Sequence, residues 1–246
     1  MSEWPQLSKP PVSVALFQLK FVRGGFDLKT VDAIDASLRS VLPNRMDNMT
    51  ADIDLPSTPY PLGASLFSGM TRLSGYTYFS QDQLEKLSVS DGYITYSYEG
   101  PYHGWEHFQS GVMQVLDSLS PVLIRQVIAR TSIRFINRFE MDEFDDPEVY
   151  FRTLISATAD DVLPFPSVKY GFKITLHISD DTYSIVNQNL DRQPDKYVYL
   201  FDIDVLNRRN IIFDLREIAK VMNQLREVKN KVFFGNVTQK TLELCR

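Results

Sequence analysis

Residues 126–139 read QVIARTSIRFINRF, and this stretch decides the fold that we expect. Its later part alternates in the way that a strand requires, because successive side chains of a strand point to opposite faces of a sheet. One face carries Thr131, Ile133, Phe135, Asn137 and Phe139, and the other carries Arg130, Ser132, Arg134, Ile136 and Arg138. The pattern predicts a long strand with one mainly apolar face against a core.

Runs of branched and aromatic residues on both sides of this strand predict further strands. The expected strands are residues 12–21, 75–80, 84–89, 93–98, 169–178, 183–190 and 197–206. Apolar residues at helical spacing predict two long helices, at residues 103–119 and 214–233, and a shorter one capped by Asp27. Thr238 is expected to cap a short last helix. Residues 44–70 contain three prolines and fit either a long excursion or an irregular edge strand.

Each half of the chain then runs in the order strand, helix, three strands, helix. We therefore expect an α+β fold of two tandem β-α-β-β-β-α units, in which an antiparallel sheet is covered by long helices. The two units could form one continuous sheet or two separate modules. This order is similar to that of TATA-binding-protein-like or helix-grip modules, and the likeness is one of topology only. Residues 1–121 are the expected N-terminal unit and residues 122–246 the C-terminal unit, with the boundary at Pro121.

Composition restricts the class of protein. With 246 residues, 43% apolar and 23% charged, the chain reads as globular. Its net charge of −5 argues against general attraction to nucleic acid or to anionic lipid. Cys245 is the only cysteine, which excludes an internal disulfide and a Cys-rich zinc site. There is no secretory signal and no apolar run of about 20 residues, so a cytoplasmic protein outside the membrane is expected.

Residues 103–107 read HGWEH, which has the form H-x-x-E-H that inverted zinc peptidases use. Two histidines four residues apart share a helix face, and Glu106 beside them would activate a metal-bound water. A third ligand would have to be His177 or a carboxylate, because the chain has three histidines. The alternative is an ordinary helix start with solvated histidines. His103, Glu106 and His107 are thus the candidate metal ligands, and zinc is the candidate cofactor.

A row of arginines on the central strand is the second candidate site. Its members are Arg130, Arg134 and Arg138 on one face, with Asn137 on the other. Guanidinium groups bind phosphate and carboxylate groups through paired hydrogen bonds, so the row suits a nucleotide, a nucleic acid or an acidic peptide. The alternative is pairing across strands with Asp202 and Asp204, which share one face of their own strand.

Several motifs extend over most of the chain. They are Pro10-Pro11-Val12 leading into a strand, Tyr102-His103-Gly104-Trp105 opening a helix, IRFINR at residues 133–138, and Leu225-Arg226 through Asn230, Phe233-Phe234 and Val237-Thr238. By these motifs the chain resembles an uncharacterised, sporadically distributed bacterial family of roughly this length. The family has no assigned activity or catalytic residues, so the resemblance implies a bacterial origin and supplies no site. Sporadic occurrence is typical of genes on mobile or defence-related islands, which implies an accessory role.

Three functions from different classes follow. The preferred one is a non-catalytic binding or regulatory protein that binds a protein partner or a small ligand in a groove between sheet and helices, or on a face of the paired units. The second is a zinc-dependent hydrolase that uses the residues of the H-x-x-E-H segment. The third is a nucleotide or nucleic-acid binder that uses the arginine row. The preferred function makes the chain a binding protein, not an enzyme.

Overall fold

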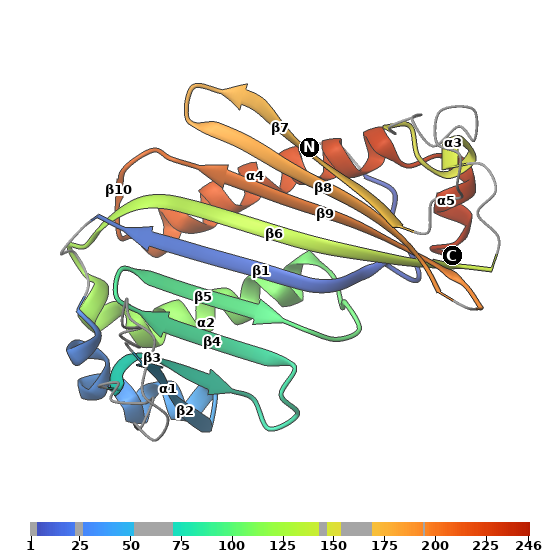
Figure 1. Ribbon diagram of the computed structural model, residues 1–246. Helices are drawn as coiled ribbons and strands as arrows, with labels where there is room; N and C mark the ends of the chain where they lie inside the picture. Colours follow the sequence, from blue (N-terminus) through green and yellow to red (C-terminus); the bar gives the residue numbers. More distant parts are fainter. Residues whose placement is uncertain (1–3, 23–26, 52–70, 143–146, 154–168, 194) are drawn as a thin grey trace, which may run out of the picture.

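The computed structural model describes residues 4–22, 27–51, 71–142, 147–153, 169–193 and 195–246. Within this part of the chain, ten strands form one antiparallel sheet. The strands are β1 (Val12–Phe21), β2 (Asn44–Ala51), β3 (Thr71–Phe79), β4 (Glu85–Ser90), β5 (Tyr93–Tyr98), β6 (Val127–Met141), β7 (Lys169–Ser179), β8 (Thr182–Arg192), β9 (Tyr197–Asn207) and β10 (Ile211–Ile212). Their order is β2-β3-β4-β5-β1-β6-β9-β8-β7, and β10 pairs with β6 (Figure 1).

The expected fold of two tandem units covered by long helices is wrong. Strands make up 44% and helices 32% of the described residues, and one continuous sheet runs through both halves of the chain. The halves join where β1 pairs with β6, which places Phe17 opposite Ile133. Two separate sheets would each leave a row of unpaired backbone groups along these strands, and the pairing satisfies both rows.

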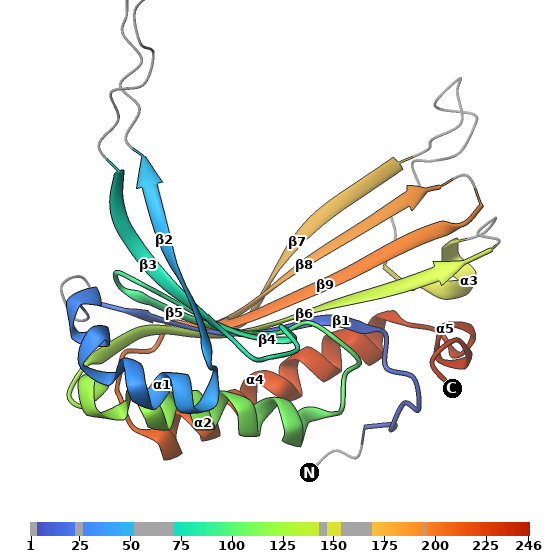
Figure 2. The same cartoon turned by 90° about the horizontal axis from the view of Figure 1, so that it is seen from below.

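The helices lie on one face of the curved sheet (Figure 2). They are the 3-10 helix η1 (Leu28–Ile34), α1 (Asp35–Val41), α2 (Trp105–Leu123), α3 (Pro147–Tyr150), α4 (Leu215–Asn236) and α5 (Gln239–Glu243). The opposite face is concave, and no helix of the described part of the chain covers it. None of the described helices is long and apolar enough to cross a membrane.

Local predictions at the helix ends are largely confirmed. Asp27, Asp214 and Thr238 each cap a helix, because their side chains accept hydrogen bonds from backbone N–H groups of the first turn. The prediction that the second helix ends at residue 119 is wrong, because Leu123 continues its buried stripe. Pro121 therefore lies in the last turn of α2, while the division of the chain at this residue stays a prediction.

The core lies between the sheet and the two longest helices. Phe108 of α2 is fully buried, and its ring centroid lies 5.9 Å from that of Tyr96 in β5 and 5.5 Å from that of Phe135 in β6. Phe233 of α4 stacks on Phe201 of β9 at 6.0 Å. Burying each such ring contributes about 2 to 3 kcal/mol, so these contacts hold both helices against the same face of the sheet.

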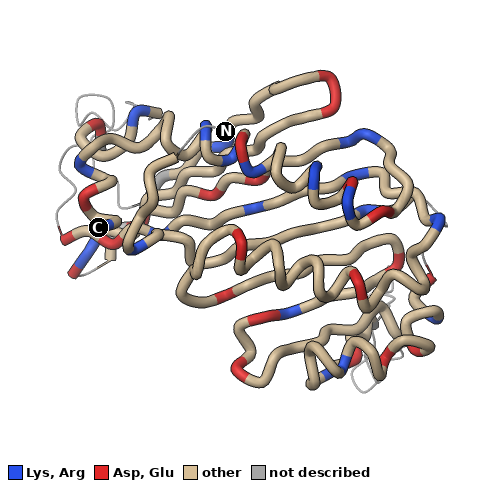
Figure 3. The backbone as a smooth tube through the Cα atoms, turned by 180° about the vertical axis from the view of Figure 1, so that it is seen from behind, with Lys and Arg blue, Asp and Glu red and all other residues tan. Residues whose placement is uncertain are grey.

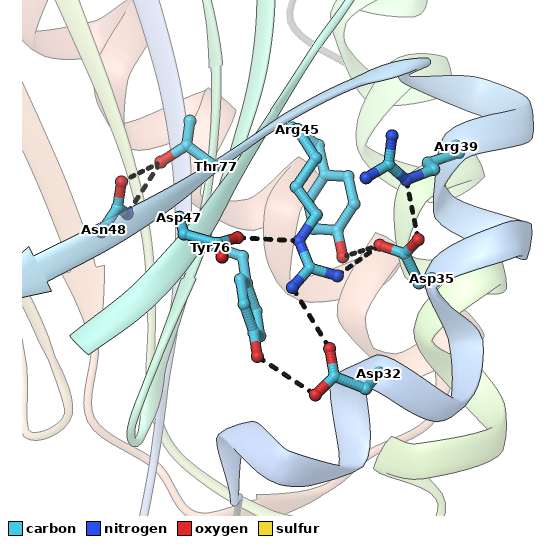
Figure 4. A network of polar contacts seen from close by, with 9 residues as sticks. Asp32, Asp35, Arg39, Arg45, Asp47, Asn48, Tyr76 and Thr77 are labelled. Carbon is cyan, nitrogen blue, oxygen red and sulfur yellow. Dashed lines mark hydrogen bonds and ion pairs between the residues drawn. The ribbon is translucent and has the colours of Figure 1, made fainter. Parts of the chain in front are cut away.

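Arg45 of β2 is the centre of a polar network that ties η1 and α1 to the edge of the sheet (Figure 4). Its partners are Asp35 at 2.6 Å, Asp47 at 3.1 Å, Asp32 at 3.2 Å and the Tyr76 ring, whose centroid lies 3.7 Å away. Burial alone would raise the pKa of Asp35, but hydrogen bonds from Arg45, Tyr78 and Arg39 lower it to about 2. Each guanidinium nitrogen of Arg45 has a carboxylate partner, so we assign the network to stability.

The sequence analysis left two structures open for residues 44–70, and the first part of this stretch forms the edge strand β2. Residues 44–51 form this strand, and residues 52–70 lie outside the described part of the chain. The strand exposes Met46 and Met49, which are 54% and 57% accessible. An edge strand without a regular buried face has no clear apolar alternation, so its pattern carried no signal.

Candidate functional site

A pocket of about 500 Å³ lies between the helix-bearing face of the sheet and the N-terminal segment. Its lining comes from four parts of the chain, namely residues 4–12, residues 102–106, Asn137 of β6 and the stretch 226–234 of α4. We call it the capped pocket, because residues 4–12 close one of its sides. Pockets of this size are typical of sites for small organic molecules.

Contacts at both of its ends hold the N-terminal segment in place. The indole of Trp4 stacks on the Phe234 ring, with centroids 5.3 Å apart and planes inclined by 7°. Its Nε1 donates a hydrogen bond of 3.0 Å to Oε2 of Glu227. Further along, the backbone N–H of Lys9 donates to the carbonyl of Cys245 at 2.9 Å. These contacts make the segment a fixed wall of the capped pocket.

The start of α2 forms a second wall. Gly104 precedes the helix with φ of 102°, a backbone conformation that favours glycine. Trp105, the first residue of α2, donates from Nε1 to Oδ1 of Asn223 in α4 at 3.0 Å. The guanidinium of Arg226 lies 5.3 Å from the centroid of the Trp105 ring and 3.7 Å from the carboxylate of Glu106. The two helices are therefore joined at the rim of the pocket.

Lys229 of α4 differs from the other charged groups of this pocket in its surroundings and in its pKa. Its Nζ lies 4.6 Å from the centroid of the Phe135 ring, and its side chain is only partly exposed. Burial, with Arg226 adding to the effect, lowers the pKa of Lys229 to about 7. Within the described residues, no carboxylate lies within 4.0 Å of this ammonium group. A cation without a partner in such surroundings is costly for the fold.

Two buried amides complete the lining. Asn137 is 2% exposed, and its Nδ2 donates to the carbonyl of Phe201 at 2.8 Å, which makes it part of the scaffold. Asn230 is 5% exposed, and its side chain makes no hydrogen bond to another described residue. Most buried amides in proteins have such partners. Asn230 is therefore free to pair with a ligand.

Two of the three residues of the H-x-x-E-H segment, His103 and His107, lie close together, and Glu106 points elsewhere. The rings of His103 and His107 lie 5.3 Å apart between centroids, and both pack against Tyr98. The side chain of Glu106 is 83% exposed and lies beside Arg226. Within the described residues, no group of three or more His, Cys, Asp or Glu side chains is arranged to hold a metal ion. His103 and Glu106 instead line the capped pocket.

The arginine row lies on the concave face, away from the capped pocket, and its members have local partners. Arg134 makes a bidentate pair with Asp202 at 2.7 and 2.8 Å, Arg138 contacts Glu140 at 2.7 Å, and Arg130 donates to Gln18. Pairing across strands is thus confirmed for Arg134 and Asp202. Asn137 points to the opposite face, so the structure separates it from the arginines.

Acidic and basic positions also alternate over the helix-bearing side of the molecule (Figure 3). No large region of a single sign is visible there among the residues that are drawn as described. A surface of mixed sign offers little general attraction to a polyanion.

Lys229 and Asn230 are the functional candidates that the sequence prediction missed. They follow Arg226 at spacings of three and four residues, and Phe233 follows at seven, so all four share one face of α4. The sequence pattern that could have indicated them is three polar residues on one helix face, followed on the same face by an aromatic residue. Such a pattern is also typical of a solvated helix face, which is why it did not stand out.

A second hollow, of about 360 Å³, lies between α4 and strands β7 and β8. Its walls are mainly apolar, with Ile174, Leu176 and Val186 from the sheet and Val228 and Val232 from the helix. Gln188, Lys231 and Asn236 add polar groups to it, but it is smaller than the capped pocket and lacks its tryptophans. We therefore take the capped pocket as the functional site.

Comparisons with known proteins assign no family to the chain. No protein-family model matches it, and no curated protein matches it. The motifs quoted in the sequence analysis nevertheless have a common location. Residues that they contribute to the lining of the capped pocket are Pro10, Pro11, Val12, Tyr102, His103, Gly104, Trp105, Asn137, Arg226, Asn230, Phe233 and Phe234.

Proposed function

We propose that this protein is a non-catalytic binding protein whose ligand occupies the capped pocket. The observation that carries the proposal is Asn230, a buried amide that lines the pocket and has no partner in the described part of the chain. A ligand that pairs with this amide replaces its contact with water by a hydrogen bond, which contributes about 0.5 to 1.5 kcal/mol. Lys229, on the same face of α4, has no carboxylate partner among the described residues.

The wall of the pocket supports binding of a small molecule. Trp4, Trp105 and Phe234 provide aromatic surface for a small molecule. The function is therefore recognition of a ligand, with the N-terminal segment as one wall.

Intrinsic fluorescence tests this proposal directly. Trp4 and Trp105 are the two tryptophans of the chain, and both line the capped pocket. A ligand that enters the pocket is expected to change their emission in a saturable way during titration with a library of metabolites. Asn230→Leu should weaken this binding about 10-fold or more, because the new side chain cannot pair with a polar ligand.

The control is Asn210→Leu, which changes an exposed asparagine in the loop before β10. It should bind as the unchanged protein does. A ligand that binds equally well to both variants lies elsewhere, and the proposal would then be wrong. Native mass spectrometry of the protein from its own cells provides a second readout, since a retained ligand appears as added mass.

The cellular setting belongs to the same proposal. We place the protein in the bacterial cytoplasm as an accessory component of a mobile or defence-related system, and the resemblance of its motifs to the bacterial family supports this. The identity of neighbouring genes tests it. Neighbours that encode only housekeeping enzymes in several genomes would contradict the accessory role.

A further inference from the structure

The polar groups of the capped pocket also indicate the class of ligand, and this step rests on the proposed function. The ionisable groups that line the pocket are Arg226 and Lys229 from α4, His103 and Glu106 from the start of α2, and Tyr102 before it. Glu106 is the only carboxylate among the lining residues, and it is mostly exposed at the rim beside Arg226. Among the described lining residues, Arg226 and Lys229 therefore outnumber the single carboxylate, and Glu227 faces Lys229 from outside the lining.

Lys229 has a special position in this arrangement. Its ammonium group lies over the Phe135 ring, and its side chain is only partly exposed to solvent. An anionic group beside it would restore the interaction that burial removes, and a neutral group would not. The lowered pKa of Lys229 agrees with this, because the charged form lacks a partner in the chain.

Asn230 adds hydrogen-bonding groups of fixed direction beside this ammonium group. It follows Lys229 in α4, so its amide and the ammonium group approach the pocket from the same helix turn. The amide donates through Nδ2 and accepts through Oδ1, and an acidic head group with several oxygen atoms can pair with the amide and with Lys229 together. An alkyl or purely cationic group would leave both unsatisfied.

Aromatic rings form a large part of the remaining lining. Tyr102, Trp105, Phe233 and Phe234 contribute rings, and the cap contributes prolines. Planar groups pack well on aromatic faces, whereas a long flexible chain loses more conformational freedom on binding. The shape and the charge together restrict the ligand to one chemical class.

We propose that the capped pocket binds a small organic anion, whose carboxylate or phosphate head group pairs with Lys229 and Asn230 while its flat apolar body packs on the aromatic wall. Arg226 lies one helix turn away and assists from the rim. Carboxylate and phosphate share the chemistry that the pocket recognises, which is a compact anion with several acceptor oxygens.

The test compares three probes that share one ring system, namely 2-naphthoate, 2-naphthyl phosphate and the neutral 2-naphthamide. Each is titrated into the intact protein by calorimetry, and tryptophan emission is recorded in parallel. We expect at least one of the anions to bind about 10- to 100-fold more tightly than the amide, since the amide lacks the charge that pairs with Lys229. The stronger of the two anions identifies the preferred head group.

Variants test whether Lys229 causes the preference for anionic probes. Lys229→Met should reduce the preference for the anion to near unity, and Lys231→Met, an exposed lysine two residues further along α4, should leave it unchanged. Asn230→Leu provides a second variant if Lys229→Met does not fold, and circular dichroism checks each protein. It should weaken binding of the anion about 10-fold.

Two results would overturn the inference. Equal binding of the amide and both anions, lost in Asn230→Leu, would show that the pocket binds ligands without choosing anions, so the proposed function would stand alone. Absence of binding by all three probes at about 1 mM would show that the pocket does not accept aromatic anions. In that case a retained native ligand in mass spectrometry would still uphold the proposed function.

Discussion

Replacement of Lys229 by methionine should stabilise the protein by an amount that depends on pH. Methionine has a similar length and no charge, so it keeps the contact with the Phe135 ring and removes the ammonium group. In the unfolded chain Lys229 holds its proton up to its ordinary pKa of 10.5, whereas in the folded protein the pKa is about 7. Between these two values the unfolded state binds more protons than the folded state.

The sign of the effect follows from this difference. Between pH 7 and pH 10.5 the free energy of unfolding of the unchanged protein rises with pH, by at most about 1.4 kcal/mol per pH unit. Lys229→Met lacks this contribution, so its advantage is largest below pH 7 and shrinks as the pH rises. Because the pocket admits solvent, which screens the charge, we expect about 1 kcal/mol of change from pH 7 to about pH 9, below the limit of about 2.7 kcal/mol.

Urea denaturation of both proteins measures this difference at about pH 6, 7, 8 and 9. The groups that face Lys229, which include Arg226 and Glu227 on α4 and His103 and Glu106 at the start of α2, are common to both proteins and cancel to first order. Lys231→Met serves as the matched control and should show no dependence of this kind. A stability difference that stays constant within about 0.3 kcal/mol across the range would refute the reasoning.

Three further predictions concern the scaffold. Asp35→Asn should cost about 1 to 2 kcal/mol at neutral pH, and because the folded pKa of Asp35 is lowered to about 2, this cost should vanish in urea titrations as the pH falls from 3.8 through 2. Phe108→Ala should lower the free energy of unfolding by about 3 to 5 kcal/mol, and Phe108→Leu by much less, because the fully buried ring would leave a cavity. Arg134→Ala should cost about 1 to 3 kcal/mol in thermal and urea denaturation, because Asp202 is 9% exposed and loses its bidentate partner. Unchanged stability of Arg134→Ala, together with loss of binding to a polyanion such as heparin, would instead assign the arginine row to ligand binding.

Strands and helix caps with a strong local pattern were predicted well from the sequence. The segment Val12–Phe21 forms a strand with the expected bounds, and the expected two faces of β6 agree with its burial pattern. Asp214 and Thr238 cap their helices because capping depends on a side chain and a backbone N–H a few residues away. Such features depend on neighbours in the chain, so the sequence contains the information that they need.

Features that depend on distant parts of the chain were not predictable in this way. Nothing in the pattern of β1 or β6 states that the two strands pair with each other, and this pairing decides for one continuous sheet, which the sequence left open beside two separate modules. The H-x-x-E-H pattern placed three residues close in sequence, but Glu106 lies beside Arg226 of α4 while the two imidazoles pack on Tyr98. Spacing along a helix does not say which neighbour a side chain meets.

The amino-acid sequence by itself determined where strands and helices form and which of their faces are apolar, because periodicity and capping are local properties of the chain. Only the tertiary structure decided that residues near Trp4, Trp105, Asn137 and Asn230 enclose one pocket. The physical reason is that a lysine or an asparagine is an ordinary polar residue until its surroundings are known. The position of Lys229 and Asn230 in the wall of a pocket, without a partner among the described residues, makes them candidates for binding an anion and is a property of the packed molecule.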